Sequence, residues 1–144
     1  MHLLPMYYFK VVVKNRSINK AAQELHITQQ TLSAHMNSVE KELGCVLFTR
    51  SPHFQLTYEG EKFYQYVKAI TGTYESMQKE FQLLYKMAAA PGRIFTRQQI
   101  MDDIWGLDTE TDPHTVDVHI GRLRDRFREN PDFEIVTMRG IGYK

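Results

Sequence analysis

Apolar residues recur at helical spacing in three segments of the first 45 residues. The first segment, residues 5–13, predicts a buried helix. Ser17 is a typical N-cap for a second helix, since its hydroxyl can accept from the free amides of the next turn. Thr28 precedes a third helix, and Gly44 ends it, because glycine readily adopts left-handed backbone. The third helix carries one apolar stripe, formed by Leu32, Met36, Val39 and Leu43.

Two short apolar runs, residues 46–48 and 54–56, flank a polar turn at residues 51–53 and predict a β-hairpin. Three helices followed by a small hairpin are the outline of a winged helix-turn-helix. The third helix is then the one that such a fold directs outward.

Thr57 caps a long predicted helix whose apolar residues follow the a/d repeat of a coiled coil. We expect its first part to form a homodimer through a seam of five residues, Phe63, Val67, Ile70, Tyr74 and Met77. The second part is expected to turn inward with Phe81, Leu84 and Met87, because one face cannot serve both purposes. A helical hairpin that oligomerises without a DNA role is the alternative interpretation of this segment.

The pattern of helix, helix and hairpin then appears a second time. Pro91–Gly92 ends the long helix, residues 93–95 predict a short strand, and Thr96 caps a helix through Trp105. After a polar, acidic loop, residues 114–129 predict a helix and residues 133–143 a hairpin. The predicted fold class is therefore mostly α with small β wings, as two winged helix-turn-helix modules joined by a long shared helix.

The exposed face of the third helix offers short polar groups with few acids. Glutamine and asparagine can pair bidentately with adenine, and serine and threonine can contact phosphates or bases. Taken alone, a solvated helix face explains this pattern equally well, but Arg50 and His53 in the wing would flank a groove and favour DNA. The candidate residues on the helix are Thr28, Gln29, Gln30, Thr31, Ser33, Ala34, His35 and Asn37.

The helix at residues 114–129 is rich in arginine. Arg122 and Arg126 are four residues apart and share one face, where guanidinium groups suit guanine edges or phosphates. Asp117 and Asp125 could pair with these arginines, so a salt-bridged surface helix is the common alternative.

Composition narrows the function classes. The formal net charge of +1 is low for nucleic-acid binding, so the argument rests on where the basic residues lie. The single cysteine, Cys45, cannot form an internal disulfide or a cysteine-based metal site. The six histidines show no ligand spacing, and no convergent catalytic set or glycine-rich phosphate loop is present. We therefore expect a cytoplasmic protein that is not an enzyme and needs no cofactor or metal.

A family resemblance covers residues 1 to about 78. The stretches YYFKVVVKNRSINKAAQELHITQQTLSAHMNSVEKELGCVLFTR and LTYEGEKF resemble the DNA-binding domain and linker helix of LysR-type transcriptional regulators. The resemblance implies dimers through the linker helix and an interrupted palindromic DNA site. Family members usually have proline where Gln30 stands and often glutamine where His35 stands, which predicts an altered base preference.

Residues from about 79 to 144 resemble a second family, the DNA-binding effector domain of OmpR/PhoB-type response regulators. The resemblance rests on KEFQLLYKMAAAPGRIFTRQQIMDDIWG, TVDVHIGRLRDRF and VTMRGIGYK. It implies that His119, Arg122 and Arg124 face the major groove or its flanking phosphates. It also implies that Thr137, Arg139 and Tyr143 are wing or backbone contacts, and that the acidic loop at residues 108–112 touches RNA polymerase.

Both resemblances also predict parts that this sequence lacks. A large effector-binding domain usually follows the first module, and a receiver domain and a four-stranded sheet usually precede the second. We therefore expect an engineered or recombined fusion with boundaries at 1–57, 58–78 and 79–144, in which Leu83 or Tyr85 lies bare without the sheet. The predicted function is sequence-specific binding of double-stranded DNA by a transcriptional regulator. The alternative is a dimeric protein-interaction scaffold whose winged modules fold but do not bind DNA strongly.

Overall fold

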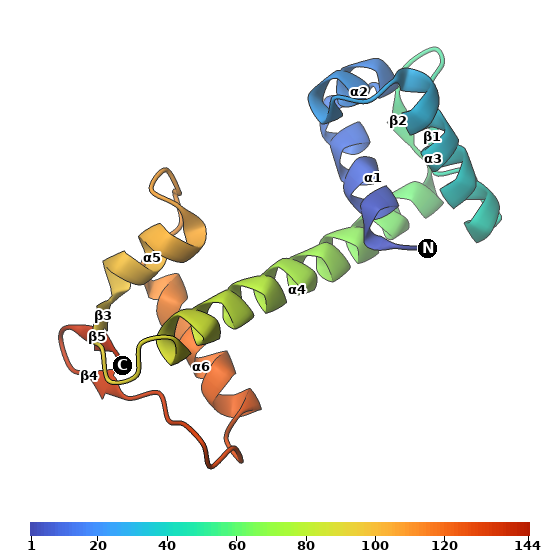
Figure 1. Ribbon diagram of the computed structural model, residues 1–144. Coiled ribbons are helices and arrows are strands. Elements are labelled where there is room, and N and C mark those ends of the chain that lie inside the picture. Colours follow the sequence, from blue (N-terminus) through green and yellow to red (C-terminus); the bar gives the residue numbers. More distant parts are fainter. The chain divides into compact units, whose positions relative to one another are not determined.

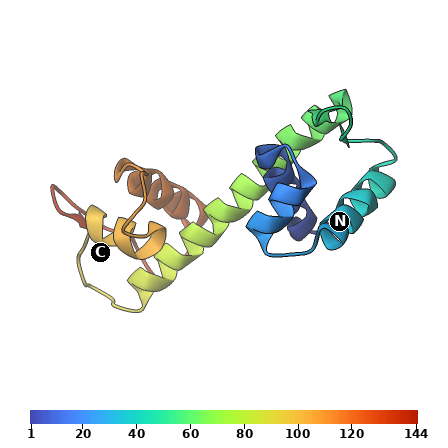
Figure 2. The same ribbon diagram turned by 90° about the horizontal axis from the view of Figure 1, so that it is seen from above.

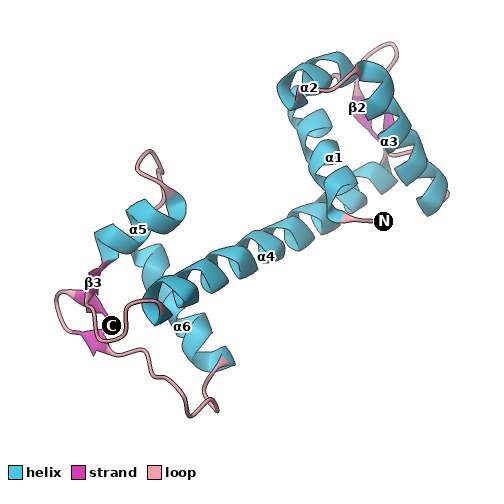
Figure 3. Ribbon diagram, viewed as in Figure 1, coloured by secondary structure: helices cyan, strands magenta, loops and turns pink.

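The computed structural model describes residues 1–144, which form two compact units, residues 1–73 and residues 74–144. Helix α4, Tyr58–Ala88, contributes its first part to unit 1 and its second part to unit 2 (Figure 1). The fold is mostly helical with small antiparallel sheets, which confirms the predicted fold class (Figure 3). The predicted domain boundaries at residues 57 and 78 remain predictions.

Unit 1 begins with three helices, α1 (Leu3–Asn15), α2 (Ile18–Leu25) and α3 (Gln29–Leu43). Both predicted caps are present: the Ser17 hydroxyl accepts from the Lys20 amide at 3.2 Å, and the Thr28 hydroxyl accepts from the Thr31 amide at 3.2 Å. The wing consists of β1 (Phe48–Thr49) and β2 (Gln55–Leu56), paired antiparallel with Phe48 opposite Leu56. Both ribbon views show α1, α2, α3 and this hairpin gathered at the end of α4 that begins at Tyr58 (Figures 1 and 2).

The core of unit 1 joins all of these elements. Fully buried side chains include Phe9, Val12, Leu32, Met36, Leu47 and Val67. Gly60 lies so close to the wing that a β-carbon there would stand 1.8 Å from the carbonyl oxygen of Leu47. The start of α4 is therefore packed directly on the backbone that leads into the wing.

Two residues of the expected dimer seam face this core: Val67 is part of it, and Phe63 is half-buried against it. Val67 has 0% exposure, and the Phe63 ring lies 4.9 Å from the Phe9 ring in α1. The prediction that Val67 faces a partner helix is wrong, because α4 covers the three-helix core with this side chain. For the half-buried Phe63 the partner contact stays a prediction. Ile70, Tyr74 and Met77 do not belong to the core of unit 1.

Unit 2 contains β3 (Phe95–Thr96), α5 (Arg97–Trp105), α6 (His114–Arg126), β4 (Thr137–Met138) and β5 (Gly142–Tyr143). The strands form one antiparallel sheet in the order β3-β5-β4, so the predicted strand before α5 joins the predicted hairpin. Regular pairing begins later than expected, at Thr137, although Val136 and Lys144 also exchange backbone hydrogen bonds of 2.9 and 3.0 Å.

The inward face of α4 in unit 2 agrees with the expected one at Met87 and Leu84, which contact the core, but not at Phe81. Leu83 is fully buried and Met87 nearly so, whereas Phe81 is 55% exposed and Leu84 is only half-buried. The heptad pattern did not predict the whole of this face correctly, because the inward stripe contains a charged residue, Glu80, which is 1% exposed. The other main core residues are Ile100, Met101, Val116, Ile120 and Leu123.

Leu83 and Tyr85 of α4 were the two side chains expected to lie bare without a covering sheet. Leu83, which we expected to be a candidate for exposure, packs in the core of unit 2. Tyr85 is 77% exposed, so it is the member of that pair that lies bare.

Candidate nucleic-acid interface

The outer face of α3 is polar and uncharged over its first three turns. Thr28, Gln29, Gln30, Thr31, Ala34 and Asn37 are exposed, as expected for a face that could enter a groove. Ser33 and His35 are half-buried, and the His35 ring lies 5.0 Å from the Tyr8 ring of α1 in an edge-on contact. Two of the eight candidate residues on α3 are therefore partly turned toward the body of unit 1.

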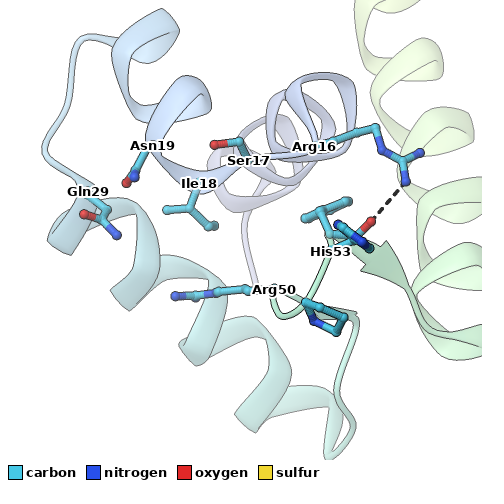
Figure 4. Close-up of a pocket in the computed structure, with 9 residues that line it drawn as sticks. Arg16, Ser17, Ile18, Asn19, Gln29, Arg50 and His53 are labelled. Carbon is cyan, nitrogen blue, oxygen red and sulfur yellow. Dashed lines mark hydrogen bonds between the residues drawn. The ribbon is translucent and has the colours of Figure 1, made fainter.

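Beside this face lies a cleft of about 660 Å³ that brings together the starts of α2 and α3 and the wing (Figure 4). The predicted wing residues Arg50 and His53 line it and are exposed. Arg16 donates from its guanidinium to the carbonyl oxygen of Phe54 at 3.0 Å, which fixes the wing to the end of α1. The cleft is lined by Arg16, Ser17, Ile18, Asn19, Gln29, Arg50, Pro52, His53 and Phe54.

The sequence did not identify three residues of this cleft as site residues: Arg16, Ser17 and Asn19. Ser17 was predicted only as an N-cap. The available signal was the polar stretch that separates the first two helices. Arg16 adopts a left-handed backbone conformation, with φ of 52°, in the turn between α1 and α2. A basic residue at such a turn lies next to the free amide groups of the following helix, where anions are stabilised.

In unit 2, α6 presents its arginines in two different ways. Arg122 and Arg126 are about half exposed and lean toward Glu80 of α4, at 3.9 and 3.0 Å from its carboxylate oxygens. Arg124 instead donates to the carbonyl oxygen of Ile135 at 2.8 Å and to the hydroxyl of Thr137 at 2.7 Å. The guanidinium group of Arg124 therefore joins α6 to the wing.

Two of the expected contact residues in unit 2 are buried. His119 is 6% exposed and its ring lies 5.0 Å from that of Trp105, so the expectation that it faces the groove is wrong. Position 119 is on the same side of α6 as the core residues Val116, Ile120 and Leu123. Burial and the nearby Arg122 lower the pKa of His119, against the opposing effect of Glu80.

Tyr143 is 4% exposed, so its ring is not a surface contact either. Its hydroxyl donates to Asp117 of α6, which also accepts from Arg97 at 2.8 Å. Burial would raise the pKa of Asp117, but hydrogen bonds from Tyr143, Arg97 and His114 outweigh it and lower that pKa. These residues fix the first turn of α6 against the central strand of the sheet. Arg139 and Thr137 remain exposed on the wing.

Comparison with known proteins decides the family. Residues 72–144, or 73 of the 144 residues, match the family described as "Transcriptional regulatory protein, C terminal". The chain belongs to this family. Residues 4–61 match a second family, described as "Bacterial regulatory helix-turn-helix protein, lysR family". Both predicted resemblances are thereby confirmed, and both families consist of transcription regulators.

Individual curated proteins are also similar to part of this chain. Over 67 residues it is 58% identical to the heme response regulator HssR of Staphylococcus aureus strains JH9 and Newman, an overlap of 46% of this chain and 30% of each relative. The chain thus spans less than a third of the length of these relatives.

Solved structures match a larger share of the chain. The BenM_DBD/catB site 1 DNA complex is 33% identical, with a TM-score of 0.58, over 60% of this chain and 94% of that chain. The CbnR_DBD–DNA complex is 27% identical, with a TM-score of 0.53, over 63% of this chain and 100% of that chain. Both structures contain DNA-binding domains bound to DNA.

The chain contains neither a metal-binding cluster nor a membrane-spanning helix. No three histidine, cysteine, aspartate or glutamate side chains lie close enough together to hold a metal ion. None of its helices combines the length and the apolar character that crossing a membrane requires.

Proposed function

We propose that this protein is a transcriptional regulator that binds double-stranded DNA in a sequence-specific manner through both of its winged units. The observation that carries the proposal is the uncharged polar face of α3 beside a cleft bordered by Arg16 and Arg50. Such a surface combines groups that read base edges with groups that hold the backbone. The two families that match the chain support the same function.

In unit 1, α3 lies in the major groove and reads bases. Gln29, Gln30 and Asn37 present amide groups that can pair with adenine, and the methyl groups of Thr31 and Ala34 can contact thymine. Thr28, Ser33 and His35, at the margins of this face, contact the sugar-phosphate backbone.

The cleft of unit 1 holds a backbone phosphate. Arg50 and His53 approach the cleft from the wing, and free amide groups at the starts of α2 and α3 border it. Arg16 is already bonded to the wing, so it adds charge without a large loss of side-chain freedom. The cleft thus sets the position of α3 on the duplex.

In unit 2, Arg122 and Arg126 contact phosphates along the groove, and Arg139 and Thr137 contact the backbone from the wing. Arg139 is exposed, and its side chain has no ion pair or hydrogen bond within the chain. Arg124, His119 and Tyr143 act indirectly, because they hold α6 against the wing and the core.

The regulator acts as a homodimer through α4. Ile70 and Met77 are exposed and Tyr74 is half-buried, so these three residues are available to a partner, whereas Val67 lies in the core and Phe63 packs against it. We assign residues 1–57 and 79–144 to the two DNA-binding modules and residues 58–78 to the linker. The acidic loop at residues 108–112 touches RNA polymerase, and the site of action is the cytoplasm.

The test is fluorescence anisotropy of the purified chain on duplexes enriched from a random pool, with the salt concentration varied. We expect enrichment of one motif and a steep loss of affinity with salt, because phosphate contacts release condensed counterions. Equal affinity for enriched and shuffled duplexes would contradict sequence-specific binding. Weak binding to both would favour the interaction scaffold, for which the exposed Phe81 and Tyr85 of α4 provide a surface.

A further inference from the structure

Glu80 is a buried carboxylate in the second part of α4. Its side chain is 1% exposed, and neither of its oxygens has a hydrogen-bond partner that meets ordinary geometry. Three side chains of α6 surround it at ion-pair distance. The carboxylate oxygens lie 3.6 Å from Nδ1 of His119, 3.9 Å from Nη1 of Arg122 and 3.0 Å from Nη1 of Arg126.

The charge of Glu80 is compensated only from α6. The neighbouring Lys79 donates to the carbonyl oxygen of Ile104 at 2.8 Å and lies 6.0 Å over the Trp105 ring, so its ammonium group is engaged elsewhere. Burying a carboxylate is tolerated when cations pair with it, and removing the pairing partner leaves a costly uncompensated charge. Arg126 therefore cannot leave Glu80 freely to bind a phosphate.

We propose that Glu80 is an internal anion that competes with DNA phosphates for Arg122 and Arg126 and so lowers the affinity of unit 2 for duplex DNA. This inference rests on the proposed contact between α6 and DNA. It assigns to Glu80 a positioning role, exerted through the two arginines, and no contact with DNA of its own. An arginine that is already neutralised within the protein releases fewer counterions when it meets a phosphate.

Arg139 provides the internal comparison. It is an exposed arginine of the same unit without an acidic partner, so it meets a phosphate with its full charge. Arg122 and Arg126 are about half exposed, which leaves part of each guanidinium group accessible while Glu80 holds the rest.

The experiment uses the full chain with Gln29→Ala and Arg50→Ala, which weakens the contribution of unit 1, and measures the remaining duplex binding by anisotropy at several salt concentrations. Glu80→Gln keeps the side-chain shape and removes the charge. We expect a gain in affinity of about three- to fivefold. The slope of log K against log salt should steepen by about 0.9 for each phosphate that is newly neutralised.

Asp103→Asn is the matched control. It removes one negative charge from the same unit, and its partner is Lys86 of α4 instead of an arginine of α6. We expect this variant to leave the slope unchanged. The Glu80→Gln effect should also disappear when Arg122 and Arg126 are both replaced by alanine, because Glu80 acts through them.

A gain in affinity cannot result from damage to the fold, which would weaken binding. If Glu80→Gln does not fold, as judged by circular dichroism, the slopes of Arg126→Ala and Arg139→Ala decide the matter. The inference requires Arg139→Ala to reduce the slope by about 0.9 and Arg126→Ala to reduce it by clearly less.

The outcomes separate the two proposals. Unchanged residual binding in Arg122→Ala and Arg126→Ala means that α6 does not bind DNA, and both the proposed function of unit 2 and this inference fail. Weakened binding in these variants without a gain in Glu80→Gln, or an equal gain in Asp103→Asn, overturns the inference alone.

Discussion

The two helices that we propose to contact DNA, α3 and α6, differ in where their positive charge comes from. The exposed face of α3 is neutral, and its unit supplies positive charge from outside the helix, through Arg16 in a turn and Arg50 in the wing. Helix α6 carries its own arginines, but two are tied to Glu80 and a third to the wing. A count of basic residues therefore says little about how much charge a helix offers to DNA, and the net charge of +1 says even less.

The largest expected effect tests whether the units fold separately. Gly60→Ala places a methyl group against the carbonyl oxygen of Leu47, and Gly142→Ala places one 1.9 Å from the carbonyl oxygen of Phe95. Each change should destabilise its own unit by about 2–4 kcal/mol, since overpacked backbone cannot yield easily. Hydrogen exchange should rise around Leu32 in the first variant and around Ile120 in the second.

The control for this pair is Gly72→Ala, in the same helix as Gly60. A β-carbon at Gly72 meets no atom within 4 Å, so the higher helix propensity of alanine should stabilise α4 by up to about 1 kcal/mol. Loss of protection in both units from either damaging substitution would show one cooperative structure instead of two.

The next effect concerns the contacts that we propose between unit 1 and DNA. Arg50→Ala should reduce affinity about tenfold on all duplexes alike, because a phosphate contact carries no sequence information. Gln29→Ala should instead reduce affinity on the enriched motif and leave shuffled duplexes nearly unaffected. Anisotropy on matched duplex pairs gives both numbers, and a motif-selective loss in Arg50→Ala would mean that this arginine reads bases.

A smaller effect is expected for the dimer. Ile70→Glu combined with Met77→Glu should yield monomer in light scattering, since both side chains are exposed and would be covered by a partner. Lys68→Glu, on another face of α4, is the control and should leave the mass unchanged. Persistence of the dimer in the double variant would place the contact elsewhere on the chain.

The smallest effect is a pH dependence confined to unit 2. The pKa of His119 is lowered by burial and by Arg122, so the folded unit disfavours the protonated ring. Its contribution to stability is complete above the unfolded pKa of about 6.5 and is lost as pH falls through the lowered folded value. Thermal melts between pH 7 and pH 5 should show this decline, and His119→Gln should flatten it. The lowered pKa of Asp117 acts only in more acidic solution.

The sequence predicts the local structure of both units better than the packing of the helix that they share. The caps at Ser17, Thr28 and Thr96, both wings and the order of helices were predictable, because they depend on local hydrogen bonding and on periodic apolar residues. The register of α4 was not. Its heptad pattern continues through both units, and only the packed structure shows that Val67 and Leu83 turn inward while Phe81 does not.

The positions of candidate site residues were predictable where a side chain stands alone. They were not predictable where a side chain is held by residues distant in the sequence. The neutral face of α3 follows directly from its sequence, whereas the burial of His119 depends on which side of α6 meets Trp105 and Glu80. Likewise, nothing local reveals that Arg124 bonds to Ile135 and Thr137, eleven and thirteen residues further along the chain.

The hydrogen bonds of Arg124 to the wing affect which duplexes unit 2 would bind. Arg124 joins α6 to the strand side of the wing, and Tyr143 joins the first turn of α6 to the central strand. Helix and wing then keep a fixed separation, so a duplex must offer a groove width that suits both at once. Sequences that are stiff in another shape would have to deform at an energetic cost. Unit 2 would thus discriminate among duplexes by their width and deformability, even at base pairs that none of its side chains touches.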